Sequence, residues 1–269
     1  MLLFYNLWHH FECNWYLYFV AVLTIFIVLL IKIPEICSLC EDAETSMNGC
    51  VLQFIKKESN RRFNKVIIKS GVSVESATKA MSLIVKENNS LLNGREIKYM
   101  YSSLSKKRLN ACVRNSANTI YVSASWFIAI TNGNEREKQF FRATLAHEIG
   151  HQTEQFPKKS LLHNFLHPFK RMFIGRVNEV RCDFFGTYHG LSGNITAGLD
   201  AMKFKRERTT FDFCDLDHPS WKKRMKYLSF GTFDETLIQK IAKDIGFRNE
   251  NVIKEVVEFY RKDDYLTLK

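Results

Sequence analysis

The chain has 269 residues, and its 39 lysines and arginines outnumber its 28 aspartates and glutamates, which gives a net charge of +11. A chain of this length can bury a substantial core, and it contains no internal repeat or low-complexity tract. The seven cysteines form an odd set without regular spacing, which argues against a disulfide-bonded scaffold and favours a reducing compartment.

A long uncharged segment near the amino terminus predicts a single transmembrane helix. Residues 13–31 lie between Glu12 and Lys32 without a charged side chain, and they approach the ~20 residues that cross a bilayer. Tryptophan and tyrosine gather at one end of this segment, as they do at membrane interfaces. A cleaved signal peptide would have a basic leader, and a buried core helix would have a polar face; neither is present. We therefore expect an interfacial leader at 1–12 and a membrane anchor at 13–31.

The distribution of charge predicts how the anchor is oriented. Every lysine and arginine lies within residues 32–269, on one side of the predicted anchor. Because positive charge tends to stay on the cytoplasmic side, we expect a short external amino terminus and a cytoplasmic carboxyl-terminal domain attracted to anionic lipid headgroups. The basic residues form only short, scattered clusters without a nucleic-acid-binding motif, so we do not expect nucleic acid as a partner. The sequence does not indicate an oligomeric state.

After the anchor, the chain divides into a connector and one domain. Residues 32–60 form a charged connector with little pattern, and residues 61–269 form the domain. Within the connector, Cys37 and Cys40 form a lone C-x-x-C pair, which we interpret as incidental and not as half of a zinc or redox site.

The domain combines a few short strands with many helices. Apolar residues at a spacing of three or four predict helices, and short β-branched or aromatic runs predict strands. The expected strands are 99–101, 112–113 and 120–122, and the expected helices include 74–87, 235–246 and 250–261. From Glu135 onward the pattern is almost wholly helical. We therefore predict an α+β domain that is mainly helical, with a small sheet packed on the helix that begins near Glu135.

The sequence His-Glu-Ile-Gly-His, from His147 to His151, is the most informative pattern in the chain. Asn134 and the acids after it predict an N-cap and the start of an amphipathic helix. Two histidines four residues apart lie on one face of such a helix, so both can reach one metal ion, and Glu148 can reach a water beside it. Gly150 weakens the helix by about 1 kcal/mol, a cost that close packing near a metal would explain. The alternative is a polar helix face with two solvated histidines.

A third ligand is needed, because a catalytic zinc site has three protein ligands and an open fourth position. The best candidate is Glu179, which forms an acid pair with Asp183 on one helical face. Glu179 could bind the metal, and Asp183 could accept a hydrogen bond from the far ring nitrogen of a ligating histidine and fix its tautomer. The alternative is an exposed helix face on which Glu179, Arg181 and Asp183 are solvated.

The order of these motifs resembles the HtpX and CAAX-prenyl-endopeptidase family of membrane-associated zinc peptidases. The likeness extends over about residues 70–230 and rests on four blocks: Asn110–Val113 with Asn118–Ser123, Thr144–His151, Asn178–Asp183 and Asp217–Met225. Cys182 stands where the family usually has alanine, a small-for-small change that we expect to have little effect. HtpX itself has further membrane spans, whereas residues 152–175 contain no uncharged run long enough to cross a bilayer. The resemblance is therefore closer to a stand-alone peptidase domain of the family.

The resemblance implies a zincin-like metallopeptidase fold with a small antiparallel sheet. It implies one Zn²⁺ per chain, held by His147, His151 and Glu179, with Glu148 as the catalytic base. We therefore predict a membrane-anchored zinc metalloendopeptidase, in which Glu148 takes a proton from the attacking water and delivers it to the leaving nitrogen. The edge strand near Asn110–Val113 would pair with an extended protein or peptide substrate.

The resemblance also implies that two residues beyond the main motifs belong to the site. His218 would stabilise the tetrahedral oxyanion, and Arg224 would contact the residues around the ligands. From the residues alone, His218 could instead mark a turn before a helix with Pro219 at its first position, and Arg224 could be solvated. Two other functions also stay open: a zinc-binding, peptidase-like membrane adaptor without proteolytic activity, and a membrane-tethered nucleic-acid binder.

Overall fold

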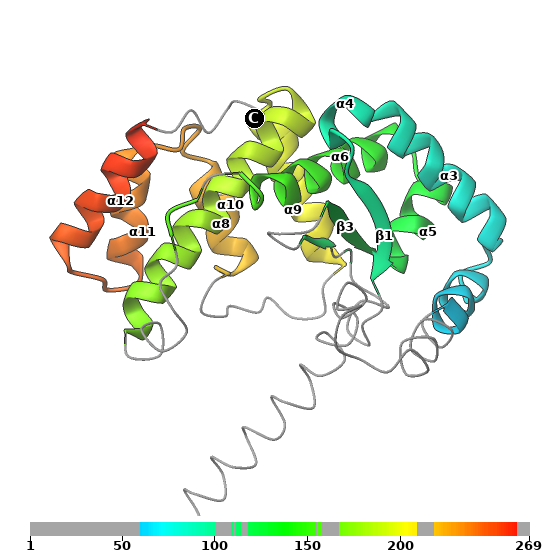
Figure 1. Ribbon diagram of the computed structural model, residues 1–269, viewed down its shortest axis with the longest axis horizontal. Helices are drawn as coiled ribbons and strands as arrows, with labels where there is room; N and C mark the ends of the chain where they lie inside the picture. Colours follow the sequence, from blue (N-terminus) through cyan, green and yellow to red (C-terminus); the bar gives the residue numbers. More distant parts are fainter. Residues whose placement is uncertain are drawn as a thin grey trace, which may run out of the picture. The chain divides into compact units, whose positions relative to one another are not determined.

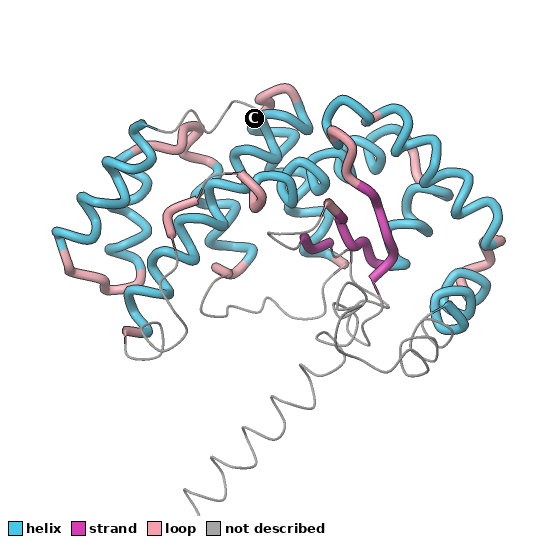
Figure 2. The backbone as a smooth tube through the Cα atoms, viewed as in Figure 1, coloured by secondary structure: helices cyan, strands magenta, loops and turns pink. Residues whose placement is uncertain are grey.

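The structure is a computed structural model that describes residues 60–100, 109, 111–113, 118–153, 155–157, 167–208 and 218–262. The chain divides into two compact units, one formed by residues 1–62 with 101–103 and the other by residues 63–100 with 104–269. Nearly all the described residues belong to the second unit. This unit is mainly helical with one small sheet (Figure 2), which confirms the predicted α+β class.

The first helices of this unit each bury one face. Residues 63–69 are helical, and α3 spans Val74–Glu87, as predicted. The Ser73 hydroxyl caps α3 by accepting a hydrogen bond from the Ser76 N–H. Ala77, Met81 and Ile84 line the buried face of α3, which packs against α5 (Ala124–Asn132). The one-turn helix α4 (Asn89–Leu92) follows α3, and neither α4 nor α5 was among the predicted helices.

The sheet has three strands in the order β1-β3-β2, with β1 at Glu96–Met100, β2 at Ala111–Val113 and β3 at Thr119–Ser123. β2 runs antiparallel to β3, but β1 runs parallel to it, so the prediction of an antiparallel sheet is wrong and the sheet is mixed. Residue patterns identify strands, whereas strand direction depends on the path of the connections between them. Every residue of β3 is buried, as a central strand requires, and β2 forms an edge among the strands that the structure describes.

Two long helices, α6 (Glu135–Gly150) and α8 (Pro168–Leu191), lie side by side and carry the predicted site (Figure 1). Asn134 caps α6 as predicted, because its side-chain oxygen accepts a hydrogen bond from the Glu137 N–H. In α8, every residue from Phe173 to Thr187 is buried. Such a helix has no solvated face, so its polar side chains must find partners inside the protein.

Glycines allow the backbones of α6 and α8 to approach closely. A Cβ atom at Gly190 would lie 2.3 Å from the Cα of Ala143, and one at Gly186 would lie 2.8 Å from the Ala143 carbonyl oxygen. On α6, a Cβ at Gly150 would lie 3.3 Å from the Cys182 Sγ. The glycine inside the histidine motif therefore packs closely against α8, which accounts for its presence in the helix.

Of the remaining described helices, α9 (Ile195–Glu207), α10 (Trp221–Leu228) and α11 (Glu235–Asp244) contact α8, and α12 (Glu250–Lys262) packs against α11. The last two confirm helices expected in the sequence, and they lie side by side in Figure 1. α8 joins both hydrophobic clusters of the unit, with Phe185 in the first and Phe173 in the second. α10 begins at Trp221, and Ser220 is its N-cap, so Pro219 does not take the first helical position that the alternative interpretation of His218 gave it.

The predicted leader, anchor and connector, at 1–12, 13–31 and 32–60, lie outside the described residues apart from Asn60. Among the residues that the structure describes, no helix combines the length and the apolar character needed to cross a membrane.

Candidate metal centre

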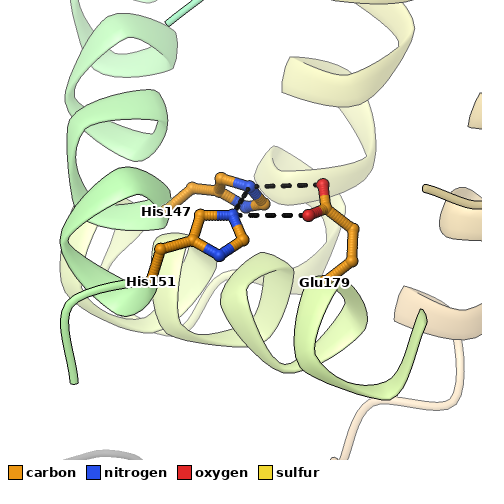
Figure 3. A group of neighbouring side chains, drawn as sticks. All are labelled: His147, His151 and Glu179. Atoms are coloured by element: carbon orange, nitrogen blue, oxygen red, sulfur yellow. Dashed lines mark hydrogen bonds and ion pairs between the residues drawn. The ribbon is translucent and has the colours of Figure 1, made fainter. Parts of the chain in front are cut away.

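Three of the predicted residues come together between α6 and α8. His147 lies in the last turn of α6, His151 is its C-cap, and Glu179 projects from the buried part of α8 (Figure 3). The Nε2 atoms of the two histidines are 3.2 Å apart. The His147 Nε2 lies 3.4 Å from the Glu179 Oε1, and the His151 Nε2 lies 3.3 Å from the Glu179 Oε2. These donor atoms are close enough together to hold one metal ion.

The burial of these residues decides between the two interpretations that the sequence left open. His147, Glu148 and Glu179 are 7%, 6% and 3% exposed. Asp183 and Arg181, which could have shared a solvated helix face with Glu179, are buried as well. The two alternatives, a polar face with solvated histidines on α6 and an exposed charged face on α8, are therefore wrong.

Asp183 contacts the ring nitrogen of His147 that faces away from Glu179. Its Oδ1 lies 3.1 Å from the His147 Nδ1, the contact expected from the spacing of the two acids. A carboxylate at this position favours a proton on Nδ1 and leaves Nε2 free to bind a metal. The acid pair thus places one carboxylate among the donor atoms and the other behind them.

Arg224, on α10, links the two acids. Its Nε donates a hydrogen bond to the Asp183 Oδ2 at 2.9 Å, and its Nη1 lies 2.9 Å from the Glu179 Oε1. Its Nη2 also pairs with the Asp183 Oδ1. The side chain is buried, and its guanidinium lies over the Trp221 ring, 4.4 Å from the ring centre. Arg224 is therefore not a solvated helix residue, and one cation compensates two buried carboxylates.

The electrostatic consequences appear as shifted pKa values. Burial alone would raise the pKa of Glu179, but the Arg224 guanidinium and His147 outweigh burial and hold that pKa well below its usual range. The pKa of Asp183 is lowered for the same reasons. Burial would lower the pKa of His147, but the carboxylates of Glu179 and Asp183 raise it to about 9. Both acids are thus carboxylates at neutral pH, which is the form that binds metals and accepts hydrogen bonds.

The far nitrogen of His151 has different neighbours. Its Nδ1 lies 3.4 Å from the Cys182 Sγ and 3.3 Å from the Gln155 Nε2. Gln155 also donates a hydrogen bond to the Cys182 Sγ at 3.3 Å. Cys182, which we expected to be a neutral replacement for alanine, therefore contacts a candidate ligand. The sequence pattern does not predict the contact between Cys182 and His151, because this contact depends on how α8 crosses α6.

A cleft of about 270 Å³ adjoins the three donor residues. Glu148 lines it, and among the described residues none hydrogen-bonds to this carboxylate or pairs with it. His218 lines the cleft as well; its side chain is 52% exposed and its Nε2 lies 3.6 Å from the Glu179 Oε2. The structure thus brings all seven residues singled out in the sequence to one place. The edge strand β2 contributes Ala111 and Cys112 to the same cleft.

Two further residues line the cleft that the sequence analysis did not select, Lys205 and Trp221. Lys205 belongs to one of the short, scattered basic clusters noted in the sequence. The sequence contained a signal, because Lys205 follows Gly198, Ala201 and Met202 by seven, four and three residues, and those three residues form the buried face of α9. A lysine on the apolar face of a helix points toward the protein interior, as the buried residues of that face do.

The chain was also compared with known proteins. It matches no protein-family model, no curated protein and no solved structure.

Proposed function

We propose that this protein is a zinc-dependent metalloendopeptidase. The observation that carries the proposal is the group of His147, His151 and Glu179, whose donor atoms surround one point beside a cleft that Glu148 lines. Two imidazoles and a carboxylate, with a free carboxylate next to the first histidine, are what hydrolysis by a metal-activated water requires.

The spacing of the donor atoms fits zinc. Zinc lies about 2.0–2.1 Å from nitrogen and oxygen ligands, so two ligands in a tetrahedron are separated by ~3.3–3.4 Å. The Nε2 atoms of the two histidines are 3.2 Å apart, and they lie 3.4 and 3.3 Å from different oxygens of the Glu179 carboxylate. Calcium and magnesium prefer shells made of oxygen, whereas zinc accepts two nitrogens and one oxygen and keeps a fourth position open. When bound by His147, His151 and Glu179, zinc would polarise the substrate carbonyl and lower the pKa of a water molecule.

The protein's own residues then have separable roles. Glu148 accepts a proton from the attacking water and transfers it to the leaving nitrogen, which its carboxylate can do because no described residue hydrogen-bonds to it. Asp183 holds His147 in the tautomer whose Nε2 faces Glu179. Arg224 keeps both acids ionised and in place, and His218, at the edge of the cleft, donates to the developing oxyanion.

The sheet supplies a surface for the substrate. Among the described strands, β2 lies at an edge, and its residues Ala111 and Cys112 line the cleft that Glu148 also lines. An extended peptide that lies along β2 would pass the donor residues. This supports a protein or peptide as the substrate class.

We further propose that the enzyme is held at a membrane by residues 13–31, with its peptidase domain on the cytoplasmic side. The support is the uncharged length of this segment and the placement of all lysines and arginines after it. The order of motifs that resembles the HtpX and CAAX-prenyl-endopeptidase family is consistent with a peptidase acting at a membrane.

Metal analysis and a cleavage assay test the proposal together. Detergent-solubilised full-length protein should contain about one zinc per chain, and Glu179→Ala should lose most of it because two ligands hold zinc weakly. The wild type should cleave unfolded casein, and a chelator should abolish cleavage. Glu148→Gln should keep its zinc and lose cleavage by at least about 100-fold, because the base is removed while the ligands remain.

Three outcomes would contradict parts of the proposal. Normal cleavage by Glu148→Gln would show that the assigned base is wrong, and full zinc content in Glu179→Ala would show that the third ligand is wrong. Zinc binding without any chelator-sensitive cleavage would favour the peptidase-like adaptor. Glu258→Gln, on an exposed face of α12, is the matched control and should change neither zinc content nor cleavage.

A further inference from the structure

Lys205 brings a positive charge into the cleft beside the metal centre. It lies on α9, and Gly198, Ala201 and Met202, which share its face of the helix, are buried. Its Nζ lies 5.2 Å from the centre of the Trp221 ring, and both residues line the cleft with Glu148 and the donor residues. An ammonium over an indole ring is held by the negative face of that ring, which fixes its position without neutralising its charge.

No carboxylate of the described residues lies within ion-pairing distance of this ammonium. Among the nearby acids, Asp183 contacts His147 and Arg224, and Glu179 contacts both histidines and Arg224, whereas Glu148 attracts the ammonium without forming an ion pair with it. Burial, and next the neighbouring Arg224, lower the pKa of Lys205 to about 8, because the attraction of Glu148, Asp183 and Glu179 does not outweigh them. An anion that entered the cleft would relieve this cost.

We propose that Lys205 binds an anionic group of the peptide substrate next to the scissile bond. The group is a carboxylate, either of an aspartate or glutamate side chain or of the substrate's own carboxyl terminus. This inference rests on the proposed peptidase function, and it adds a substrate class to it: peptides with a negative charge near the cleaved bond.

The competing explanation is that Lys205 only packs against Trp221. A packing role would affect all substrates equally, because it would change the shape of the cleft. A charge-recognition role would affect acidic substrates alone. The informative quantity is therefore a ratio, the kcat/KM for an acidic peptide divided by that for its neutral analogue.

The test uses one casein peptide whose cleavage site by the wild type has been mapped. It is made in four forms: with glutamate or with glutamine beside the scissile bond, and with a free or an amidated carboxyl terminus close to that bond. The first pair measures recognition of a side chain, and the second measures recognition of a chain end. We expect the wild type to favour the charged member of at least one pair by about 10- to 100-fold in kcat/KM, as a charge-assisted hydrogen bond provides.

Lys205→Met keeps most of the side-chain volume but removes the charge, and it should reduce this preference to within about threefold. Lys205→Arg should retain the preference, because it restores a cation. Lys203→Met is the matched control, since Lys203 lies on the same helix with an exposed side chain, and it should leave the ratio unchanged. Lys205→Gln serves the same purpose should Lys205→Met fail to fold.

Equal cleavage of charged and neutral peptides by the wild type would overturn the inference, as would a preference that persists in Lys205→Met. A binding measurement separates this outcome from failure of the peptidase proposal. The zinc-loaded Glu148→Gln variant should bind a fluorescent glutamate peptide about tenfold or more tightly than the glutamine peptide, and adding Lys205→Met should remove the difference. If neither peptide is cleaved but this difference is present, the peptidase function fails while the anion site stands; if the difference is absent, the anion site fails.

Discussion

Replacing Arg224 by methionine should reveal how much the metal centre depends on its buried cation. Arg224 is 7% exposed and contacts both Asp183 and Glu179. Methionine fills a similar volume without a charge. The change therefore leaves two buried carboxylates without their shared partner, while the packing of α10 on α8 is largely kept.

The size of the effect follows from the contacts. Removing one partner of a buried ion pair costs about 3–5 kcal/mol, because the remaining charge is uncompensated. Since Arg224 compensates two acids, we expect a loss of about 4–5 kcal/mol in the metal-free protein. Bound zinc would itself compensate the charge of Glu179, so that only Asp183 would lose its compensating cation. In the zinc-loaded protein we therefore expect Arg224→Met to lower the free energy of unfolding by about 2–3 kcal/mol.

Thermal unfolding of the detergent-solubilised protein, with a chelator and with zinc, measures both quantities. For a domain of this size 1 kcal/mol corresponds to about 2–4 °C, so Arg224→Met should lower the midpoint by roughly 8–20 °C without metal and by clearly less with zinc. Arg261→Met is the control, because the exposed Arg261 pairs with Glu235 and Glu258 at the surface and should contribute about 0–1 kcal/mol. A loss below about 1 kcal/mol in metal-free Arg224→Met, or a loss that zinc does not reduce, would refute this reasoning.

Two other predictions follow from the helix pair that holds the site. Gly190→Ala should destabilise the protein by about 2–3 kcal/mol in the same unfolding assay, because its Cβ would lie 2.3 Å from the Ala143 Cα. Gly150→Ala should cost about 1 kcal/mol or less, because its Cβ would meet only side chains, at 3.3 Å. Equal effects of the two substitutions would contradict the close approach of α6 and α8. In chelated protein, His147 should make stability fall with rising pH: its pKa is raised to about 9 in the folded state, so its contribution is fully present below the unfolded pKa of about 6.5 and is lost as pH rises through about 9. Urea unfolding across this range measures the slope, and a slope that is unchanged in His147→Gln would exclude His147 as its source.

Much of the local structure could be predicted from the sequence, because it depends on neighbours along the chain. The spacing of apolar residues predicted α3, α11 and α12, and Asn134 with the acids after it predicted the start of α6. A four-residue separation places two side chains on one helical face in any helix, so the pairing of His147 with His151 needed no tertiary information. α10 shows the limit of local rules, since a proline at position 219 suggested a helix start there but the helix begins at Trp221 with Ser220 as its N-cap.

Features that depend on how elements cross could not be predicted in the same way. The predicted direction of β1 was wrong, because residue patterns identify a strand whereas the connections between strands set its direction. Cys182 and Lys205 were misjudged because the contacts of Cys182 with His151 and of Lys205 with Trp221 exist only when α8 and α9 are in place. The helix α5 was not identified, since it lacks the polar face that marks an amphipathic segment.

The sequence by itself determined which chemical groups this protein offers: two histidines and a glutamate on one helix, an acid pair on another, and a histidine and an arginine further along. The tertiary structure decided that these groups lie together. It buries α8 on all sides, so that Glu179 and Asp183 must face the histidines and Arg224 instead of water, and it adds Lys205 to the cleft. The physical reason is that helical spacing arises from local geometry, whereas burial and charge compensation arise only where distant segments meet.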